Sequence, residues 1–387
     1  MSFDFYLPTR ILFGKGKLNE LSRQKLPGKK ALIVTSSGPS MKKYGYLARL
    51  EEQLDKANVE HVLFDKILPN PIVKHVMEGA ALAKESGCDF VIGLGGGSSI
   101  DSAKAIAVMA TNEGHYWDYV SGGSGKGKPV PNDPLPIVAI TTTAGTGTEA
   151  DPWTVITNGK EKIGFGYEKT FPTLSIVDPE LMMTVPPHLT AYQGFDALFH
   201  STEGYLNITA NEMSDLFALK AISLLGKSLP AAVADGSNEA ARTDVALANT
   251  FAGIVEFTSG CISEHSIEHA LSAFHPELPH GAGLIMISKA YYTFIAKSGT
   301  SDERMVEMAK ALGKSDASDP MDFVDALHEL QVQCGVDNLK MSDYGIKPEE
   351  FEDLAANALE TMGGLFEVDP CKITHADIVQ ILRDSYR

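Results

Sequence analysis

Residues 90–104 read F-V-I-G-L-G-G-G-S-S-I-D-S-A-K, an apolar run followed directly by glycines and then by a helix-forming segment. A short apolar run bounded by turn residues is typical of a strand buried on both faces of a parallel sheet. Glycines after such a strand let backbone N–H groups approach an anion, and the following helix N-terminus adds favourable partial charge. The glycine order is neither G-x-G-x-x-G nor that of a P-loop. The stretch indicates a phosphate-binding turn; the alternative is an ordinary tight turn from strand to helix.

Strand-like and helical segments alternate through the first half of the chain. Residues 3–13 read as extended. Further strands are expected at residues 30–35, 60–64, 90–94, 136–141 and 174–177, with helices from about residue 18 and at 47–54, 72–86 and 99–109. This alternation predicts an α/β domain with a parallel sheet and helices on both faces. Beyond it, helices are expected at 190–205, 212–225, 239–257, 264–274, 301–312, 320–330, 348–359 and 375–385. We therefore predict an α/β domain over residues 1–183 and an all-helical domain over residues 184–387.

Two further polar turns follow predicted strands of the same sheet. Residues 141–149 read T-T-T-A-G-T-G-T-E, and residues 35–40 read T-S-S-G-P-S. Turns of this kind at strand ends suggest a dinucleotide lying across the carboxyl edge of the sheet. The second turn lacks the acidic residue that often binds a ribose 2′-hydroxyl, and Lys42 and Lys43 follow it, which favours NADP over NAD. The alternative is an ordinary polar turn with lysines on a solvated helix face.

The second half of the chain carries a metal-ligand pattern, with five of the eleven histidines in one stretch. Asp196 and His200 are four residues apart, as are His265 and His269, a spacing that puts both members of each pair on one helix face. His280 follows a proline and precedes a glycine, which places it at a loop-to-helix turn. A carboxylate with imidazoles suits a divalent transition metal, and no cysteine lies at metal-ligand spacing from these residues. The alternative to a metal site is that Asp196 and His200 form a surface pair on a helix and that the other histidines are hydrogen-bonded core residues.

Composition limits the classes of partner and the compartment. A chain of 387 residues is expected to form two domains, and its net charge of −17 argues against nucleic acid or an anionic membrane surface. No apolar run reaches the length of about 18 residues that a membrane span requires. The first 13 residues do not read as a signal peptide. Four scattered cysteines fit a reducing cytoplasm better than a disulfide framework.

Together the motifs resemble the iron-dependent (group III) alcohol dehydrogenase family, including its NADP-linked members that act on butanol or propanediol. The resemblance covers nearly the whole chain. It is carried by F-x-F-x-x-P-T-R-I-x-F-G-x-G at 3–16, L-P-N-P at 68–71, the glycine turn, A-G-T-G-T-E at 144–149, D-P-E-L-M with paired prolines at 178–187, G-F-D-A-L-F-H-S-T-E-G-Y-L at 194–206, H-x-x-x-H at 265–269 and P-H-G at 279–281. The family implies a dehydroquinate synthase-like architecture, in which a nucleotide domain and a helical metal domain enclose the active site.

The resemblance also implies roles for individual residues. The metal ligands are expected to be Asp196, His200, His265 and His280, and the metal is expected to be iron(II), with zinc as the alternative. His269 is expected to line the substrate pocket and to relay a proton; the alternative is that it orients a metal ligand. Asp101 is expected to be catalytic as well as to bind cofactor. The cofactor contacts are expected at Ser36, Gly38, Ser40, Asn70, Gly96, Gly97, Ser98, Asp101, Lys104, Thr142, Thr143, Thr146, Lys162 and Leu181.

Two departures from the family pattern surround His280. Ten residues separate it from His269, one more than the usual family spacing, and they include an additional histidine, His275. The residues after P-H-G are A-G-L-I-M-I-S, without the Leu-Pro of the family. His275 therefore competes with His280 as a ligand, and we favour His280.

The predicted function is that of a metal-dependent alcohol dehydrogenase or aldehyde reductase, which transfers a hydride between NAD(P) and a small alcohol or aldehyde. A dehydroquinate synthase-like lyase is one alternative, but residues 192–206 and 262–274 contain no Lys or Arg for an acidic substrate. A non-catalytic assembly protein is the other. The family resemblance further implies a homodimer that pairs through the N-terminal strand. Neither nucleic acid nor membrane is expected as a partner, and the expected compartment is the cytoplasm.

Overall fold

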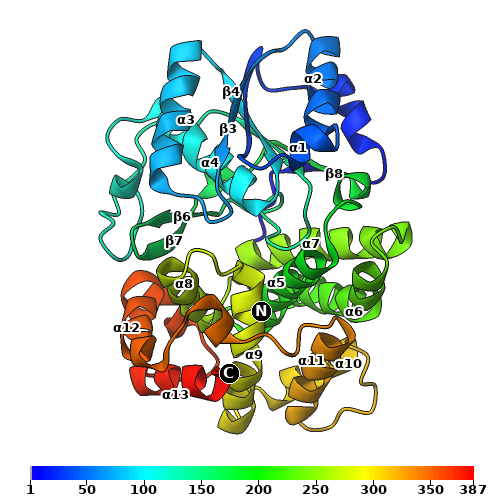
Figure 1. Ribbon diagram of the computed structural model, residues 1–387, viewed down its shortest axis with the longest axis vertical. Coiled ribbons are helices and arrows are strands. Elements are labelled where there is room, and N and C mark those ends of the chain that lie inside the picture. The colour runs from blue at the N-terminus through cyan, green and yellow to red at the C-terminus, as the bar shows by residue number, and fades with distance from the viewer. Residues whose placement is uncertain (1) are drawn as a thin grey trace. The chain divides into compact units, whose positions relative to one another are not determined.

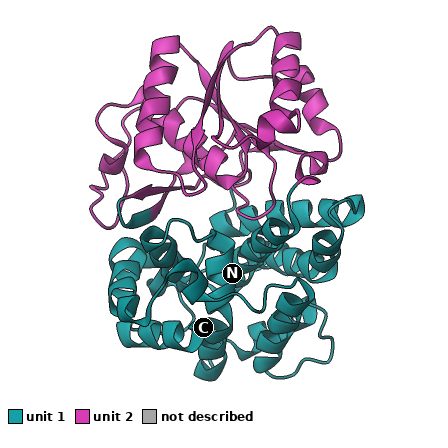
Figure 2. Cartoon of the chain, in the orientation of Figure 1, with its two compact units in different colours: residues 1–6, 159–162, 185–387 teal, residues 7–158, 163–184 magenta. Residues whose placement is uncertain are grey.

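The chain forms two compact units in a computed structural model that describes residues 2–387 (Figure 1). The α/β unit comprises residues 7–158 and 163–184, and the helical unit comprises residues 2–6, 159–162 and 185–387 (Figure 2). The sequence prediction placed residues 2–6 and 159–162 in the α/β domain, whereas in the structure these two short segments belong to the helical unit.

The α/β unit is built on a six-stranded sheet in the order β1-β8-β5-β4-β2-β3. Its strands are β1 (Arg10–Phe13), β2 (Lys30–Ser36), β3 (Glu60–Ile67), β4 (Phe90–Gly95), β5 (Ile137–Thr141) and β8 (Leu174–Val177). Every neighbouring pair is parallel, which confirms the predicted parallel sheet. A separate two-stranded hairpin, β6 (Thr154–Asn158) with β7 (Glu161–Phe165), was not predicted from the sequence.

Helices cover both faces of this sheet. They are α1 (Ser40–Lys43), α2 (Tyr46–Lys56), α3 (Val73–Ser86) and α4 (Gly97–Thr111), with short 3-10 helices at Lys17–Arg23, Tyr116–Asp118, Glu168–Thr170 and Pro179–Met182. Successive strand residues point to opposite faces, so Leu32 packs in one core with α3 and α4, whereas Ile33 packs in a second core with α2. Burial on both faces explains why these strands read as continuous apolar runs.

The turn from β4 to α4 depends on close approach of the backbone. Gly95 has φ +148°, a conformation that residues with a Cβ rarely adopt. At Gly93 an added Cβ would lie 2.8 Å from the Cα of Ile100, so glycine lets α4 lie directly against its own strand. The N-terminus of α4 is thereby held at the carboxyl edge of the sheet.

From residue 185 onward the second unit is built of helices, as predicted. Its helices are α5 (Pro187–Leu206), α6 (Glu212–Ala234), α7 (Glu239–Thr258), α8 (Ser263–Phe274), α9 (His280–Ser298), α10 (Asp302–Ala311), α11 (Met321–Gln333), α12 (Phe351–Met362) and α13 (His375–Ser385), with 3-10 helices at Met341–Tyr344, Pro348–Glu350 and Gly363–Glu367. The sequence prediction did not include α9, although it placed His280 correctly at a loop-to-helix turn.

Helix α6 meets the length and composition of a membrane span, and so does the bent pair of α7 and α8 when the two are taken together. Core helices of globular proteins meet the same criteria. In this unit α6 packs against α5 and α7, and Lys220 and Lys227 interrupt its apolar sequence. We therefore interpret α6 as a core helix.

We expect the Gly93→Ala substitution to lower the free energy of unfolding by about 2 kcal/mol, because a methyl group would force α4 away from β4. Chemical denaturation measures the change. Gly363→Ala is the matched control, because an added Cβ there meets nothing within 4 Å. Equal stability of the two variants would contradict the close-packing argument.

Candidate metal and cofactor sites

Helix α5 presents two of the predicted ligands from its buried face. Asp196 and His200 lie one turn apart, and each side chain is almost completely buried. Their nearest polar atoms, Asp196 Oδ1 and His200 Nδ1, are 3.9 Å apart. The helix begins with Pro187 in its first turn, a position where the missing N–H costs nothing.

Helices α8 and α9 bring the other predicted ligands to the same carboxylate. The Nε2 atoms of His265 and His280 lie 3.6 Å and 3.3 Å from Asp196 Oδ1. The ligand atoms of these three residues all lie within 4.8 Å of one another. Gly281 allows this approach, because an added Cβ would lie 2.1 Å from the carbonyl oxygen of Tyr192 in α5. The glycine of the P-H-G motif therefore lets the start of α9 touch α5.

The donor set fits a divalent metal ion. Asp196 Oδ1 and His265 Nε2 are buried and, among residues 2–387, have no hydrogen-bond partner. Leaving such atoms unpaired is costly, and a bound cation would satisfy both at once. One carboxylate oxygen with imidazole nitrogens is a suitable set for iron(II) or zinc. The fourth predicted ligand, His200, lies beside this set: its ring stacks on that of His265 with centroids 4.4 Å apart, and its ligand atom groups with those of Cys261 and His265.

Two buried glutamates that the sequence prediction missed orient the histidines. Glu203 Oε1 contacts Nδ1 of His265, and Glu268 Oε2 contacts Nδ1 of His280. Both glutamates are fully buried. A carboxylate at Nδ1 fixes the tautomer and turns Nε2 toward a metal. Glu203 was recognisable in principle, since residues 196, 200 and 203 follow the i, i+4, i+7 spacing of one helix face.

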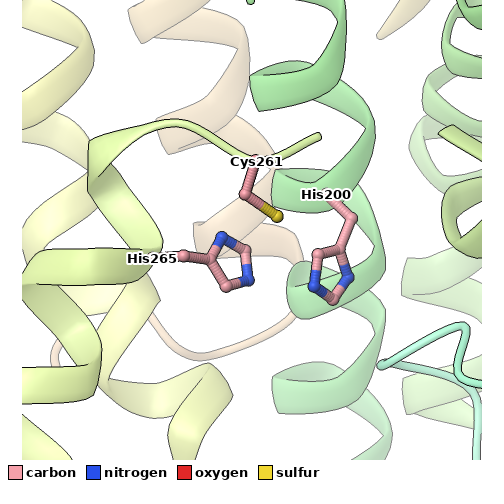
Figure 3. Close-up of side chains that lie close together, drawn as sticks. All are labelled: His200, Cys261 and His265. Atoms are coloured by element: carbon pink, nitrogen blue, oxygen red, sulfur yellow. The ribbon is translucent and has the colours of Figure 1, made fainter. Parts of the chain in front are cut away.

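Cys261 corrects the prediction that no cysteine lies at metal-ligand spacing. It belongs to the loop between α7 and α8, and its sulfur lies within 4.8 Å of nitrogens of His200 and His265. Figure 3 shows the thiol entering from this loop beside the two imidazole rings. Burial raises the pKa of the Cys261 thiol far above its ordinary value, with a smaller opposing effect from His265. The residue is therefore a buried neutral thiol next to the predicted ligands.

The competing histidine, His275, points elsewhere. It follows the last residue of α8, and its Nε2 lies 3.2 Å from Glu350 Oε2. None of the clusters of metal-ligating atoms formed by residues 2–387 includes it. The additional residue between His269 and His280 lengthens the loop without moving His280 away from Asp196.

His269 lies beside the ligand set. Its ring centroid is 5.3 Å from that of His280, and its Nδ1 lies 2.9 Å from the sulfur of Met362. Burial, reinforced by the charges of Lys162 and His280, holds the pKa of His269 well below its ordinary value. Burial alone would raise the pKa of Asp196, but the charges of His200 and His280 outweigh it and hold that pKa well below the usual range. The site therefore combines an ionised carboxylate with a neutral imidazole.

Most of the predicted cofactor residues gather at the carboxyl edge of the sheet in the α/β unit. An added Cβ at Gly96 would lie 2.9 Å from Thr143 Oγ1, and one at Gly97 would lie 2.4 Å from Thr146 Cγ2. The hydroxyl of Ser98 donates to the carbonyl of Pro69, next to Asn70. Thr142 continues from β5 and donates its N–H to the carbonyl of Gly95 at 2.9 Å. These turns form a narrow cradle at a helix N-terminus, which suits a pyrophosphate.

The turn after β2 holds the residues predicted to select the cofactor. Ser36 ends β2, Gly38 follows in the turn, and Ser40 begins α1. The positive charge of Lys42 is paired with a carboxylate, because its ammonium lies 2.5 Å from Asp65 Oδ2. The sequence prediction did not foresee this ion pair, which joins residues 23 positions apart.

Four predicted cofactor residues lie away from that cradle surface. The ammonium of Lys104 is fully buried and contacts Thr148 Oγ1, the carbonyls of Asp151 and Trp153, and Asp151 Oδ1 at 2.6–3.0 Å. The carboxylate of Asp101 accepts hydrogen bonds from Thr148 Oγ1 at 2.7 Å and from the N–H of Val155 at 2.9 Å. These contacts of Lys104 and Asp101 hold residues 148–155, the segment that leads into β6, in place. Leu181 is a fully buried core residue, and Lys162 belongs to the helical unit.

Comparison with known proteins gives a consistent result for both halves of the chain. Residues 8–179 match the family model "Iron-containing alcohol dehydrogenase", and residues 190–386 match "Fe-containing alcohol dehydrogenase family, C-terminal". Alcohol dehydrogenase 4 of Saccharomyces cerevisiae is 34% identical over 99% of this chain and 98% of its own length. The NAD-dependent methanol dehydrogenase of Bacillus methanolicus is 34% identical over 99% of each chain. The crystal structure of the archaeal Red Sea brine pool alcohol dehydrogenase ADH/D1 has a TM-score of 0.94 and 35% identity, covering 100% of this chain and 99% of the other.

The two candidate ligands near α9 are distinguished by substitution. We expect His280→Ala to lose most of its bound metal, because Asp196 Oδ1 then lacks its nearest imidazole, whereas His275→Ala should retain it. Metal analysis after anaerobic purification measures both. Metal loss in the His275 variant with retention in the His280 variant would reverse the assignment.

Asp101 predicts a pH dependence of stability. Burial, opposed in part by Lys104 and Thr148, raises the pKa of Asp101 from 3.8 to about 6. The folded protein therefore binds more protons than the unfolded chain between these two values, and its free energy of unfolding falls as the pH rises through that window. The loss of stability across the window amounts to about 3 kcal/mol in the wild type. We expect the Asp101→Asn variant to lack it, because the amide does not titrate.

Denaturation curves between pH 3.5 and 7 measure the effect of the Asp101 substitution. Asp316→Asn, at an exposed position, is the control. Parallel stability profiles for wild type and the Asp101 variant would show that this carboxyl group does not titrate in the window.

Proposed function

The chain belongs to the iron-containing alcohol dehydrogenase family, and from this premise we propose that it is an iron(II)-dependent, NADP-preferring dehydrogenase of small aliphatic alcohols and aldehydes. Its class is that of a metal-dependent alcohol dehydrogenase, and the lyase alternative is not favoured. The observation that carries the proposal is the set formed by the buried Asp196 and His265 with the partly exposed His280, whose ligand atoms converge within 4.8 Å.

The residues of the helical unit hold the metal and handle the proton. Asp196, His200, His265 and His280 would bind the ion, which when bound supplies a Lewis acid for the substrate oxygen. Glu203 and Glu268 keep the imidazoles of His265 and His280 turned inward. We assign His269 the transfer of the hydroxyl proton toward solvent, because it lies next to His280 without competing for Asp196.

The α/β unit positions the nicotinamide cofactor, which accepts or supplies the hydride. Gly96, Gly97 and the N-terminus of α4 cradle its pyrophosphate. The absence of an acidic residue from residues 35–40 supports NADP. Lys42 would contact the 2′-phosphate, and its pairing with Asp65 limits this preference. One similar protein, the methanol dehydrogenase named above, is NAD-dependent. The preference for NADP over NAD is therefore the part of the proposal that most needs a direct test.

Substrate and assembly are proposed more broadly. Phe251, Phe257, Ile262 and Phe274 led us to expect a small apolar alcohol or aldehyde, and all four lie on or beside α7 and α8 in the helical unit. We also propose a cytoplasmic homodimer, on the family resemblance of the N-terminal strand and on the scattered cysteines.

The proposed function is tested with anaerobically purified protein. We expect close to one equivalent of iron and faster butyraldehyde reduction with NADPH than with NADH. Asp65→Asn should raise the NADPH-to-NADH ratio of kcat/KM by about threefold, because Lys42 loses its partner, whereas Lys42→Met should lower it. Lys25→Met, at an exposed position outside this turn, serves as the control.

Each outcome of this experiment decides a different part of the proposal. His269→Ala should lower turnover and leave the metal content intact; loss of metal would make it a ligand. A preference for NADH would overturn only the cofactor choice. A sample with neither metal nor turnover would overturn the metal-dependent function itself.

A further inference from the structure

The hairpin tip between β6 and β7 is fixed onto the helical unit. Asn357 Nδ2 of α12 donates to the carbonyl of Lys160 at 3.0 Å, and the Lys160 ammonium lies 4.1 Å from the ring centroid of Phe274 at the end of α8. Two residues further on, Lys162 is 5% exposed. The ammonium of Lys162 therefore lies buried in the interior of the helical unit.

The ammonium of Lys162 lies behind the predicted ligand His280. It donates to Ser272 Oγ at 2.9 Å and lies 3.6 Å from Glu268 Oε2. It is also 3.5 Å from His280 Nδ1. Because Glu268 contacts that same nitrogen, Nδ1 carries a proton and does not accept one from Lys162. The charge of Lys162 therefore acts on Glu268.

Helix α9 makes room for the carboxylate of Glu268. An added Cβ at Gly283 would lie 2.7 Å from Glu268 Oε1 and 2.8 Å from its Cγ. Gly283 is the second residue after the P-H-G motif. The glycine at this position thus gives space to a fully buried glutamate, and a buried carboxylate without a counter-charge is strongly destabilising.

We propose that Lys162 is a positioning residue of the metal centre: it pairs with Glu268, whose carboxylate holds Nδ1 of His280 and keeps Nε2 directed at Asp196. The chain Lys162–Glu268–His280 thus joins the hairpin tip, α8 and α9 in one polar network. The inference rests on the metal-dependent function proposed above, but its tests read stability, metal exchange and cofactor binding rather than turnover.

This role differs from the cofactor contact that the sequence predicted for Lys162. A cofactor contact requires an ammonium that can reach the ligand, whereas the structure directs this one to Ser272 and Glu268 inside the helical unit. The two roles predict different consequences when the charge is removed.

The first experiment is a double-mutant cycle on the metal-free protein. Lys162→Met should lower the midpoint of thermal unfolding by about 10 °C, because the carboxylate of Glu268 is left buried and unpaired. Adding Glu268→Gln should recover at least half of that loss, because the amide carries no charge. Lys289→Met removes a lysine of the helical unit at an exposed position and should change the midpoint by less than about 2 °C.

The second experiment follows the metal directly. Glu268→Gln should release bound cobalt(II) or zinc to a chelator at least about tenfold faster than wild type, because His280 loses its charged acceptor. Gly283→Ala should act in the same direction by displacing the carboxylate while leaving every charge in place. Both variants should shift the visible absorption of the cobalt(II) protein, whereas the control Gly363→Ala should not.

Two results would overturn the proposal. One is a Lys162→Met variant with an unchanged midpoint and a weakened dissociation constant for NADPH, since that pattern belongs to a cofactor contact. The other is metal release from Glu268→Gln at the wild-type rate. Both differ from failure of the proposed function, in which the wild-type protein itself would bind no metal.

Discussion

The helical unit is organised around a carboxylate oxygen that faces imidazole nitrogens without a hydrogen bond. Asp196 Oδ1 and His265 Nε2 are both buried and unpartnered among residues 2–387, and His280 Nε2 lies 3.3 Å from the same oxygen. Such an arrangement is unfavourable unless a cation lies among the ligand atoms. The three helices that carry these side chains are held in place by contacts elsewhere, and a bound metal ion would offset the local cost.

Close backbone approach is the means by which both units present their sites. In the helical unit, Gly281 lets α9 touch α5 and Gly283 leaves room for Glu268. In the α/β unit, Gly93 brings α4 onto β4, and Gly96 and Gly97 face Thr143 and Thr146. At each of these positions only glycine fits, because an added Cβ would collide with an atom of the neighbouring element.

The fold class was predictable because its signals are local. Continuous apolar runs identified each strand of the parallel sheet, and the i, i+4 pairs identified the helices that carry Asp196 and His265. The β6–β7 hairpin and α9 were missed for different reasons. The hairpin strands are short and mix polar with apolar residues, so they lack a clear period. Helix α9 begins H-G-A-G, and glycines argue against a helix unless the packing that requires them is known.

The site was predictable only where ligand spacing is local, and its supporting charges were not. Lys162 and Glu268 are separated by more than a hundred residues, and nothing in either segment identifies the other as its partner. Glu268 by itself is typical of a solvated helix face, and only the fold shows it to be fully buried behind His280. Cys261 and His275 show the limits of sequence spacing. Cys261 was not expected near the metal site, yet its sulfur lies beside His200 and His265. His275 was considered as an alternative to His280, yet it lies next to Glu350. Sequence spacing thus identifies the atoms that can bind a metal, whereas the tertiary structure determines which charges hold them in the orientation that binding requires.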